Sequence, residues 1–273
     1  MTSRSSGRLL HGLGLILVFA VTVFPTYWMV SSSFKTQADL LASPPVWFFT
    51  PTLANYAEVF ADQKVTHAVV NSLIVAIFST GLSVLLGTPA AFALARYEFR
   101  GKSDLWFWFI SNRFVSPIVL ALPIYILARN LGLLDTHLVL ILVYITFILP
   151  IVIWIATDQF RSIPKELEEA ARLEGASQFA IFWRIYLPLG LPGIAVSAIF
   201  GFIFSWNELL YALVLTRRDV QTAPVVATSF MSGYELPWGK IMATGSVIVL
   251  PVTIFALLVS RHMVRGLTMG ATK

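Results

Sequence analysis

The sequence contains no cysteine and few charged residues. Without cysteine, a disulfide framework, thiolate catalysis and Cys-ligated metal sites are all excluded. Charged residues make up 12% of the chain, about half of the ~25% that is usual in soluble domains. Hydrophobic residues make up 57%, and the mean hydropathy is +0.79. A soluble core of 273 residues could not bury this much apolar surface, so the composition indicates an integral membrane protein.

Common catalytic motifs are also missing from the sequence. It contains no H-E-x-x-H or G-x-S-x-G pattern, and an intramembrane enzyme therefore remains only a remote alternative. No G-x-x-x-x-G-K-[ST] sequence is present, so the chain has no P-loop for ATP. The four histidines share no ligand spacing, and we expect no metal site. The net charge of +5 comes without a basic cluster interleaved with aromatics, and we expect no nucleic-acid partner.

Six stretches of the chain are apolar and long enough to cross ~30 Å of hydrocarbon at about 20 residues each. We therefore predict a single all-α membrane domain, residues 1–273, with six transmembrane helices. The predicted spans lie near residues 9–31, 70–95, 105–128, 137–157, 189–215 and 241–261.

The distribution of Lys and Arg predicts the orientation of these spans. With the N-terminus inside, the cytoplasmic segments hold twice as many of these residues as the external ones, as the positive-inside rule requires. Both termini are then cytoplasmic, and so is the segment 161–188. Residues 32–69 and 216–240 form long external loops.

The segment 161–188 is unusually charged for this chain. Glu168 and Arg172 are spaced i,i+4 in the favourable order for pairing on a helix. Ala170 and Ala171 allow another surface to approach closely, and Gly175 suits a turn with positive φ. One interpretation is a hairpin that merely connects two spans at the headgroups. The other is a surface that another protein recognises.

The spacing within this segment matches a known signature. Glu169, Ala170, Ala171 and Gly175 are followed by Ile185, Leu187 and Pro188 in the pattern E-A-A-x3-G-x9-I-x-L-P. The pattern resembles the cytoplasmic loop of binding-protein-dependent ABC importer permeases. Further stretches resemble the maltose-transporter kind, and in particular its shorter, G-type subunit. They are Ser33–Lys35, Asn55–Tyr56, Ala93–Tyr97, Leu131–Thr136 and Arg265–Thr268.

This resemblance implies a type I ABC importer permease in the cytoplasmic membrane of a bacterium or archaeon, surrounded by lipid. Its expected partners are a second permease subunit, two ATPase subunits and a solute-binding protein. The chain itself would hold no cofactor, because the partner ATPase binds ATP and Mg. The solute would be a carbohydrate or related polyol; a permease for a non-sugar solute is the alternative. The residues implied in ATPase coupling are Glu168, Glu169, Ala170, Ala171, Arg172, Gly175, Leu187 and Pro188.

Polar residues within the spans are candidates for the translocation path, because charge at membrane depth is costly and rarely idle. Glu208 could instead lie near the outer headgroups or be paired within the bundle. For Arg113, a buried structural ion pair with a carboxylate is the favoured interpretation. The candidate path residues are Arg113, Tyr144, Trp206, Asn207 and Glu208.

Two further features complete the prediction. Gly193, Ser197, Gly201 and Ser205 form a small-xxx-small stripe for tight packing against a neighbouring span or the second permease. The outer loop 216–240 is the expected contact for the solute-binding protein, through Pro224, Tyr234 and Trp238.

Overall fold

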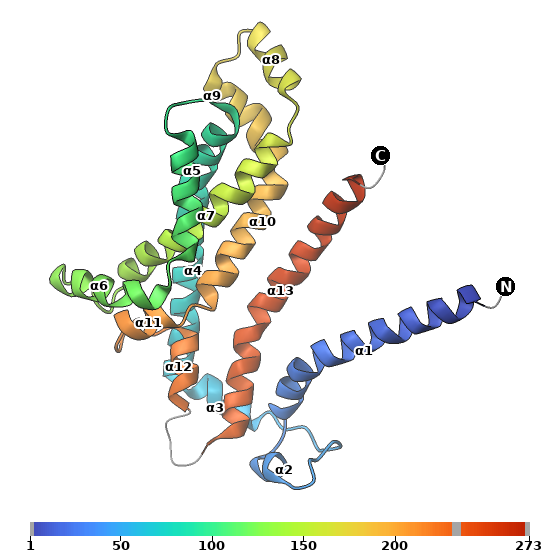
Figure 1. Cartoon of the computed structure of the whole chain (residues 1–273). Helices are drawn as coiled ribbons and strands as arrows, with labels where there is room; N and C mark the ends of the chain where they lie inside the picture. The colour runs from blue at the N-terminus through green and yellow to red at the C-terminus, as the bar shows by residue number, and fades with distance from the viewer. Residues whose placement is uncertain (1–2, 231–235, 271–273) are drawn as a thin grey trace. The chain divides into compact units, whose positions relative to one another are not determined.

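The computed structural model describes residues 3–230 and 236–270, and all regular structure in these ranges is helical (Figure 1). The longer helices include five that are long and apolar enough to cross a membrane, or six if one bent pair forms a single span. The predicted all-α class is therefore confirmed. The α-helices have these bounds: α1 Ser3–Ser32, α2 Gln37–Leu41, α3 Ala54–Ala61, α4 Gln63–Arg96, α5 Lys102–Ser111, α6 Pro117–Asn130, α7 His137–Arg161, α8 Lys165–Leu173, α9 Gln178–Ile181, α10 Leu187–Trp206, α11 Leu210–Leu215, α12 Ala223–Ser229 and α13 Trp238–Gly270.

The third predicted span, 105–128, is broken. Helix α5 continues into a short 3-10 turn, η1 (Asn112–Phe114), and α6 then leaves at a bend of 96°. Val115 and Ser116 are extended between them. Pro117 explains the break, because the ring of a proline disfavours helical backbone at the residue before it. Pro117 therefore begins α6.

The fifth predicted span, 189–215, is also divided, since α10 ends at Trp206 and α11 begins at Leu210. At its other end, α10 is continuous with α9 through a π-helical turn, η2 (Phe182–Tyr186). A proline in a helix has no N–H to donate to the backbone carbonyl four positions before it, and its ring clashes with that carbonyl. We infer that the wider π turn lets the helix pass through Pro188 without ending.

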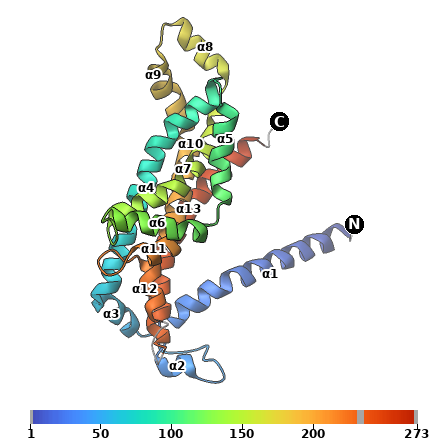
Figure 2. The same ribbon diagram turned by 60° about the vertical axis from the view of Figure 1, so that its left-hand side comes forward.

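The chain divides into two compact units. One comprises Met1–Thr66 and Ala227–Leu250, and the other His67–Val226 and Pro251–Lys273. In the second unit, α4, α7 and α10 lie side by side, and α8 and α9 lie at one end of them (Figures 1 and 2). The single domain predicted from the sequence stays a prediction.

The small residues of α10 pack against neighbouring spans, as predicted. A Cβ added to Gly193 would lie 2.6 Å from Gln159 Cβ of α7, and one added to Gly201 would lie 2.8 Å from Ile148 Cγ2. Near the end of the stripe, the Ser205 hydroxyl is 3.0 Å from that of Ser79 in α4. The stripe therefore permits the close approach of α10 to both helices.

Gly193→Ala is expected to destabilise the protein, because the new methyl group would meet a Cβ that cannot move without its backbone. Overpacking of this kind costs roughly 1–3 kcal/mol, or a fall of about 2–8 °C in apparent Tm for a chain of this size. Thermal unfolding in detergent measures the shift. Gly81→Ala in α4 is the matched control, because nothing lies within 4 Å of its Cβ position. Equal Tm values for the two variants would contradict this packing.

In the first unit, two motifs that are separated in the sequence join. The Asn55 side-chain amide donates to the carbonyls of Ser33 and Lys35, each at 2.8 Å. The Tyr56 hydroxyl is 2.8 Å from that of Ser33. Lys35 is buried; its Nζ donates to the Val46 carbonyl at 2.7 Å and also lies over aromatic rings. These contacts bring Ser33–Lys35 and Asn55–Tyr56 together in the fold.

Candidate functional site

Helices α8 and α9 form a hairpin at one end of the helices of the second unit (Figure 2). Between them, Gly175 has a φ of +82°, which only glycine adopts without strain. The turn predicted at this residue is confirmed. Ser177 then caps α9 by accepting a hydrogen bond from the Ala180 N–H at 3.2 Å. The hairpin is thus built from two short helices with defined ends. We refer to residues 165–181 as the coupling hairpin, after the role that the resemblance to ABC importer permeases implies.

The inner side of the coupling hairpin is held by Glu168, which is only 8% exposed. One carboxylate oxygen accepts from Arg172, the i,i+4 pair predicted from the sequence. The other accepts from the Tyr186 hydroxyl at 2.7 Å and lies 3.8 Å from Nε of Arg96. Arg96 also donates to the carbonyl of Ile163 and stacks over the Tyr186 ring at 4.6 Å. We call this group, Arg96, Glu168, Arg172 and Tyr186, the base network.

The base network joins three elements: the end of α4, helix α8 and the π turn before α10. Apolar packing surrounds it, since Phe92 lies 4.8 Å from the Tyr186 ring and Ala171 packs against the same cluster. Buried charges need partners of opposite charge and hydrogen bonds. Arg96 was not among the site residues predicted from the sequence. It did belong to Ala93–Tyr97, one of the stretches that resemble the maltose-transporter kind.

The outer side of α8 has a different character. Glu169 and Ala170 are exposed, and Leu173 is 91% exposed. The outer side of α8 therefore offers a carboxylate, a small side chain and an exposed leucine to the surroundings. Leu173 was missed by sequence reasoning, although a leucine flanked by Arg172 and Glu174 was a possible signal. The two predicted residues beyond the hairpin lie in the first turn of α10, where Leu187 is half-buried and Pro188 is exposed.

Within the spans, Glu208 is paired inside the fold. Its carboxylate accepts from the Tyr144 hydroxyl at 2.8 Å and from the backbone N–H groups of Tyr211 and Ala212 at 3.0 and 3.2 Å. It therefore satisfies two backbone N–H groups in the first turn of α11, which have no partner within that helix. Tyr144 and Trp206 are both almost fully buried. Asn207 is exposed but donates to the carbonyl of Ile203.

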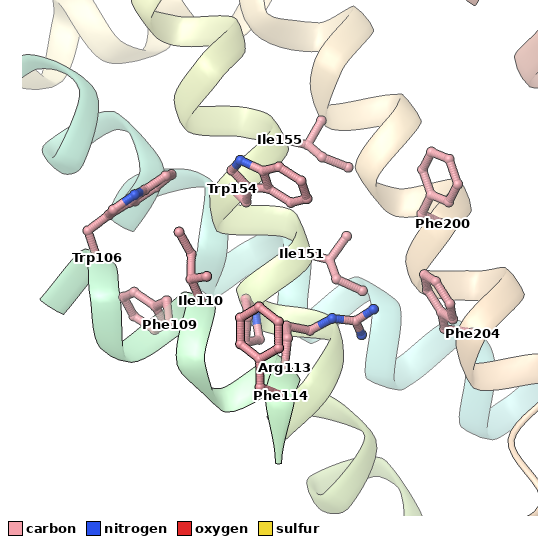
Figure 3. Close-up of a pocket in the computed structure, with 11 residues that line it drawn as sticks. Trp106, Phe109, Ile110, Arg113, Phe114, Ile151, Trp154, Ile155, Phe200 and Phe204 are labelled. Carbon is pink, nitrogen blue, oxygen red and sulfur yellow. The ribbon is translucent and has the colours of Figure 1, made fainter. Parts of the chain in front are cut away.

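Arg113 lies apart from those residues, at the break between α5 and α6. The sequence favoured a buried pair with a carboxylate. In the structure the residue is exposed, and among the described residues no carboxylate lies within 4.0 Å of its guanidinium. The guanidinium instead lies 5.1 Å from the ring of Phe204. It borders a cavity of about 500 Å³ between α5, η1, α7 and α10 (Figure 3).

At the other end of the second unit, Asp135 organises the loop that follows α11. Its carboxylate oxygens accept four backbone N–H groups, those of residues 217–220, at 3.0–3.2 Å. The Asn71 amide donates to the carbonyls of Asp219 and Gln221 in the same loop. Burial opposes ionisation of Asp135, but the four N–H donors outweigh it and lower the pKa of the carboxyl group below its usual 3.8.

Asp135→Asn is expected to lower the apparent Tm by roughly 3–6 °C, because charge-assisted hydrogen bonds are replaced by weaker ones. Because the pKa of Asp135 is lower in the folded state, its ionised carboxylate stabilises the fold above pH ~3.8. This contribution is lost as the pH falls through the pKa of the folded state. The difference between wild type and variant should therefore shrink below about pH 4. Thermal unfolding between pH 3 and 7 tests this. Asp219→Asn, at an exposed side chain of the same loop, should change little; an equal effect would contradict the role of Asp135.

The three residues predicted to contact a solute-binding protein are described unequally. Pro224 is half-buried in the first turn of α12, and Trp238 is half-buried at the start of α13. Tyr234 lies outside the described residues, as do residues 271–273 at the end of the chain.

Comparison with known proteins agrees with this arrangement. Residues 83–269 match the model of the family described as "Binding-protein-dependent transport system inner membrane component". The chain is 38% identical over 260 residues to the trehalose transport system permease protein SugB of Mycobacterium tuberculosis, covering 94% of each chain. It is 34% identical over 270 residues to the diacetylchitobiose uptake system permease protein DasC of Streptomyces coelicolor, covering 98% of each.

A solved structure shows the same fold. A chain of a bacterial ABC transporter involved in the import of the acidic polysaccharide alginate aligns with a TM-score of 0.76 and 22% identity, covering 96% of this chain and 98% of that one. With five or six apolar spans and a family match over most of its length, this chain belongs to the inner-membrane permease family of binding-protein-dependent transport systems.

Proposed function

We propose that the chain is one of two permease subunits of an ABC importer that carries a carbohydrate or related polyol across the cytoplasmic membrane. A solute-binding protein delivers the solute on the outer side, and two ATPase subunits bind ATP and Mg on the inner side. Both termini and the coupling hairpin are cytoplasmic, in keeping with the excess of Lys and Arg in the segments assigned to that side. Hydrolysis belongs to the ATPase subunits, because the sequence has no P-loop.

The coupling hairpin is the single observation that carries this proposal. Its base network attaches it firmly to α4 and α10, while Glu169, Ala170 and Leu173 face outward. Such an element transmits force: a partner that moves the outer face also moves the helices joined to the base. The carbohydrate assignment is supported by the relatives named for trehalose and diacetylchitobiose, and by the resemblance to the maltose type.

The proposal is tested by expressing the chain with the second permease, ATPase and solute-binding protein from its gene neighbourhood. The complex is reconstituted in liposomes, and ATP hydrolysis is measured with the binding protein in the presence of trehalose, maltose or diacetylchitobiose. Methionine serves as the non-sugar control. We expect one of the disaccharides to stimulate hydrolysis and methionine to have no effect. Stimulation by methionine alone, or failure of the chain to co-purify with the ATPase, would contradict the proposal.

A further inference from the structure

The cavity beside Arg113 is apolar except for that one residue. Most of its walls are aromatic or aliphatic side chains, and Figure 3 shows the guanidinium extending between Ile151 and Phe204. Trp106 and Phe109 of α5, Trp154 of α7 and Phe200 of α10 provide further aromatic surface. A volume of about 500 Å³ is within the usual range for small-molecule sites. The cavity thus combines several aromatic faces with a single set of strong hydrogen-bond donors.

One wall of the cavity lies midway along α7. Pro150, which lines it, stands 13 residues after the first residue of α7 and 11 before the last. At ~1.5 Å per residue, it is roughly 16–20 Å from either end of the helix. Arg113 likewise stands 11 residues after the first residue of α5. We infer that its guanidinium lies inside the hydrocarbon core, which is ~30 Å thick. A lipid phosphate is an unsuitable partner at this depth.

An arginine at this depth requires a partner. Ionisable residues inside membranes are rare and almost always face the bundle interior or a water-filled cavity. Among the residues that the structure describes, the guanidinium has only the Phe204 ring, at 5.1 Å. A ring face offers partial compensation for the charge, but it accepts none of the five N–H hydrogen bonds that arginine can donate.

We propose that this cavity contacts the transported solute, and that Arg113 donates its N–H fork to adjacent oxygen atoms of a carbohydrate. The planar fork matches two neighbouring oxygens, whether hydroxyl or carboxylate. The aromatic walls present apolar faces to the C–H surface of a sugar ring. This inference rests on the proposed function and adds to it a specificity-determining residue. Glu208 and Tyr144, by contrast, bond to each other inside the fold.

The first test is uptake by the reconstituted complex of whichever disaccharide stimulates the wild type most, among trehalose, maltose and diacetylchitobiose. Arg113→Gln is expected to lower the uptake rate by about tenfold, since charge-assisted hydrogen bonds are lost. Arg113→Lys keeps the charge but not the planar fork, so its uptake rate should lie between those of the wild type and Arg113→Gln. Arg129→Gln is the matched control, because it removes an exposed arginine at the end of α6, outside the cavity; its uptake should equal the wild-type rate.

The second test uses the absence of native cysteine. Ile110→Cys places one thiol on the cavity wall while Arg113 is retained. With cysteine-free partner subunits, a charged thiol reagent should label this residue, and the same disaccharide should slow labelling by about threefold or more. Protection should disappear when Arg113→Gln is added. Labelling that the disaccharide does not slow would overturn the inference.

The outcomes separate this inference from the proposed function. If no disaccharide stimulates the wild-type complex, the proposed function fails. If the wild type transports but Arg113→Gln transports equally well, only the inference about Arg113 fails. If Arg113→Gln instead releases the second permease subunit during purification, the guanidinium pairs with a carboxylate of that subunit, and the solute contact is overturned.

Discussion

Glu169→Lys is expected to abolish solute-stimulated ATP hydrolysis by the reconstituted complex while leaving the fold intact. Glu169 is exposed on the outer face of α8, and the resemblance to maltose-type permeases implies that it would lie near a basic residue of the ATPase. Reversing a charge that becomes buried in an interface costs roughly 2–5 kcal/mol. We therefore expect stimulation to fall at least about thirtyfold, measured as phosphate release with and without the loaded binding protein.

The control for this variant is Glu98→Lys. Glu98 is also exposed and forms an i,i+4 ion pair with Lys102, so the change in charge is the same but lies outside the coupling hairpin. Its pKa is lowered by that lysine, and the surface pair contributes little to stability. Stimulation should stay near the wild-type value. Coupling through Glu169 would be refuted if Glu169→Lys still responded to the binding protein, or if both variants lost the response equally.

Arg96→Met is expected to destabilise the protein more than any other substitution considered. The Arg96 and Glu168 side chains are 3% and 11% exposed, and removal of one partner leaves a buried carboxylate with less compensation. Losses of about 3–5 kcal/mol follow from breaking such a pair, or a fall in apparent Tm of roughly 6–15 °C. The same variant should also weaken coupling, because α8 loses its attachment to the end of α4.

The effect can be assigned to the pair by a double-mutant cycle. Arg96→Met with Glu168→Met removes both charges, and should be less destabilised than the sum of the single variants. Arg161→Met is the matched control, since its pair with Asp158 is exposed and is worth at most ~1 kcal/mol. If Arg96→Met and Arg161→Met showed the same Tm, the base network would not hold the hairpin as described.

The sequence was sufficient for much of the fold because hydrophobic length is a strong local signal. The all-α class, the tight packing of α10 and the turn at Gly175 all follow from residues close together in the chain. The breaks at Pro117 and Glu208 were missed for different reasons. The first required weighing one proline against a long apolar run. The second lies beside a carboxylate that accepts hydrogen bonds from the first turn of α11 and from Tyr144, 64 residues away.

The candidate site shows the same division. Its pattern from Glu169 to Pro188 could be recognised in the sequence because the residues lie within 20 positions at fixed intervals. Apart from Arg172, the partners of Glu168 could not be predicted, since Tyr186 lies 18 residues after it and Arg96 belongs to a different helix, α4. Arg113 was expected to form a buried pair, which the described residues do not supply. Contacts between distant segments are set by packing, and no local periodicity reports them.

The two sides of α8 have a consequence for protein engineering. Residues that bind the hairpin to its own subunit, Glu168 and Ala171, alternate with residues that face away from it, Glu169, Ala170 and Leu173. The outward set can therefore be exchanged for that of another permease without disturbing the inward set. Under the proposed function, a few exposed positions of the hairpin would then determine which ATPase subunit a given permease binds.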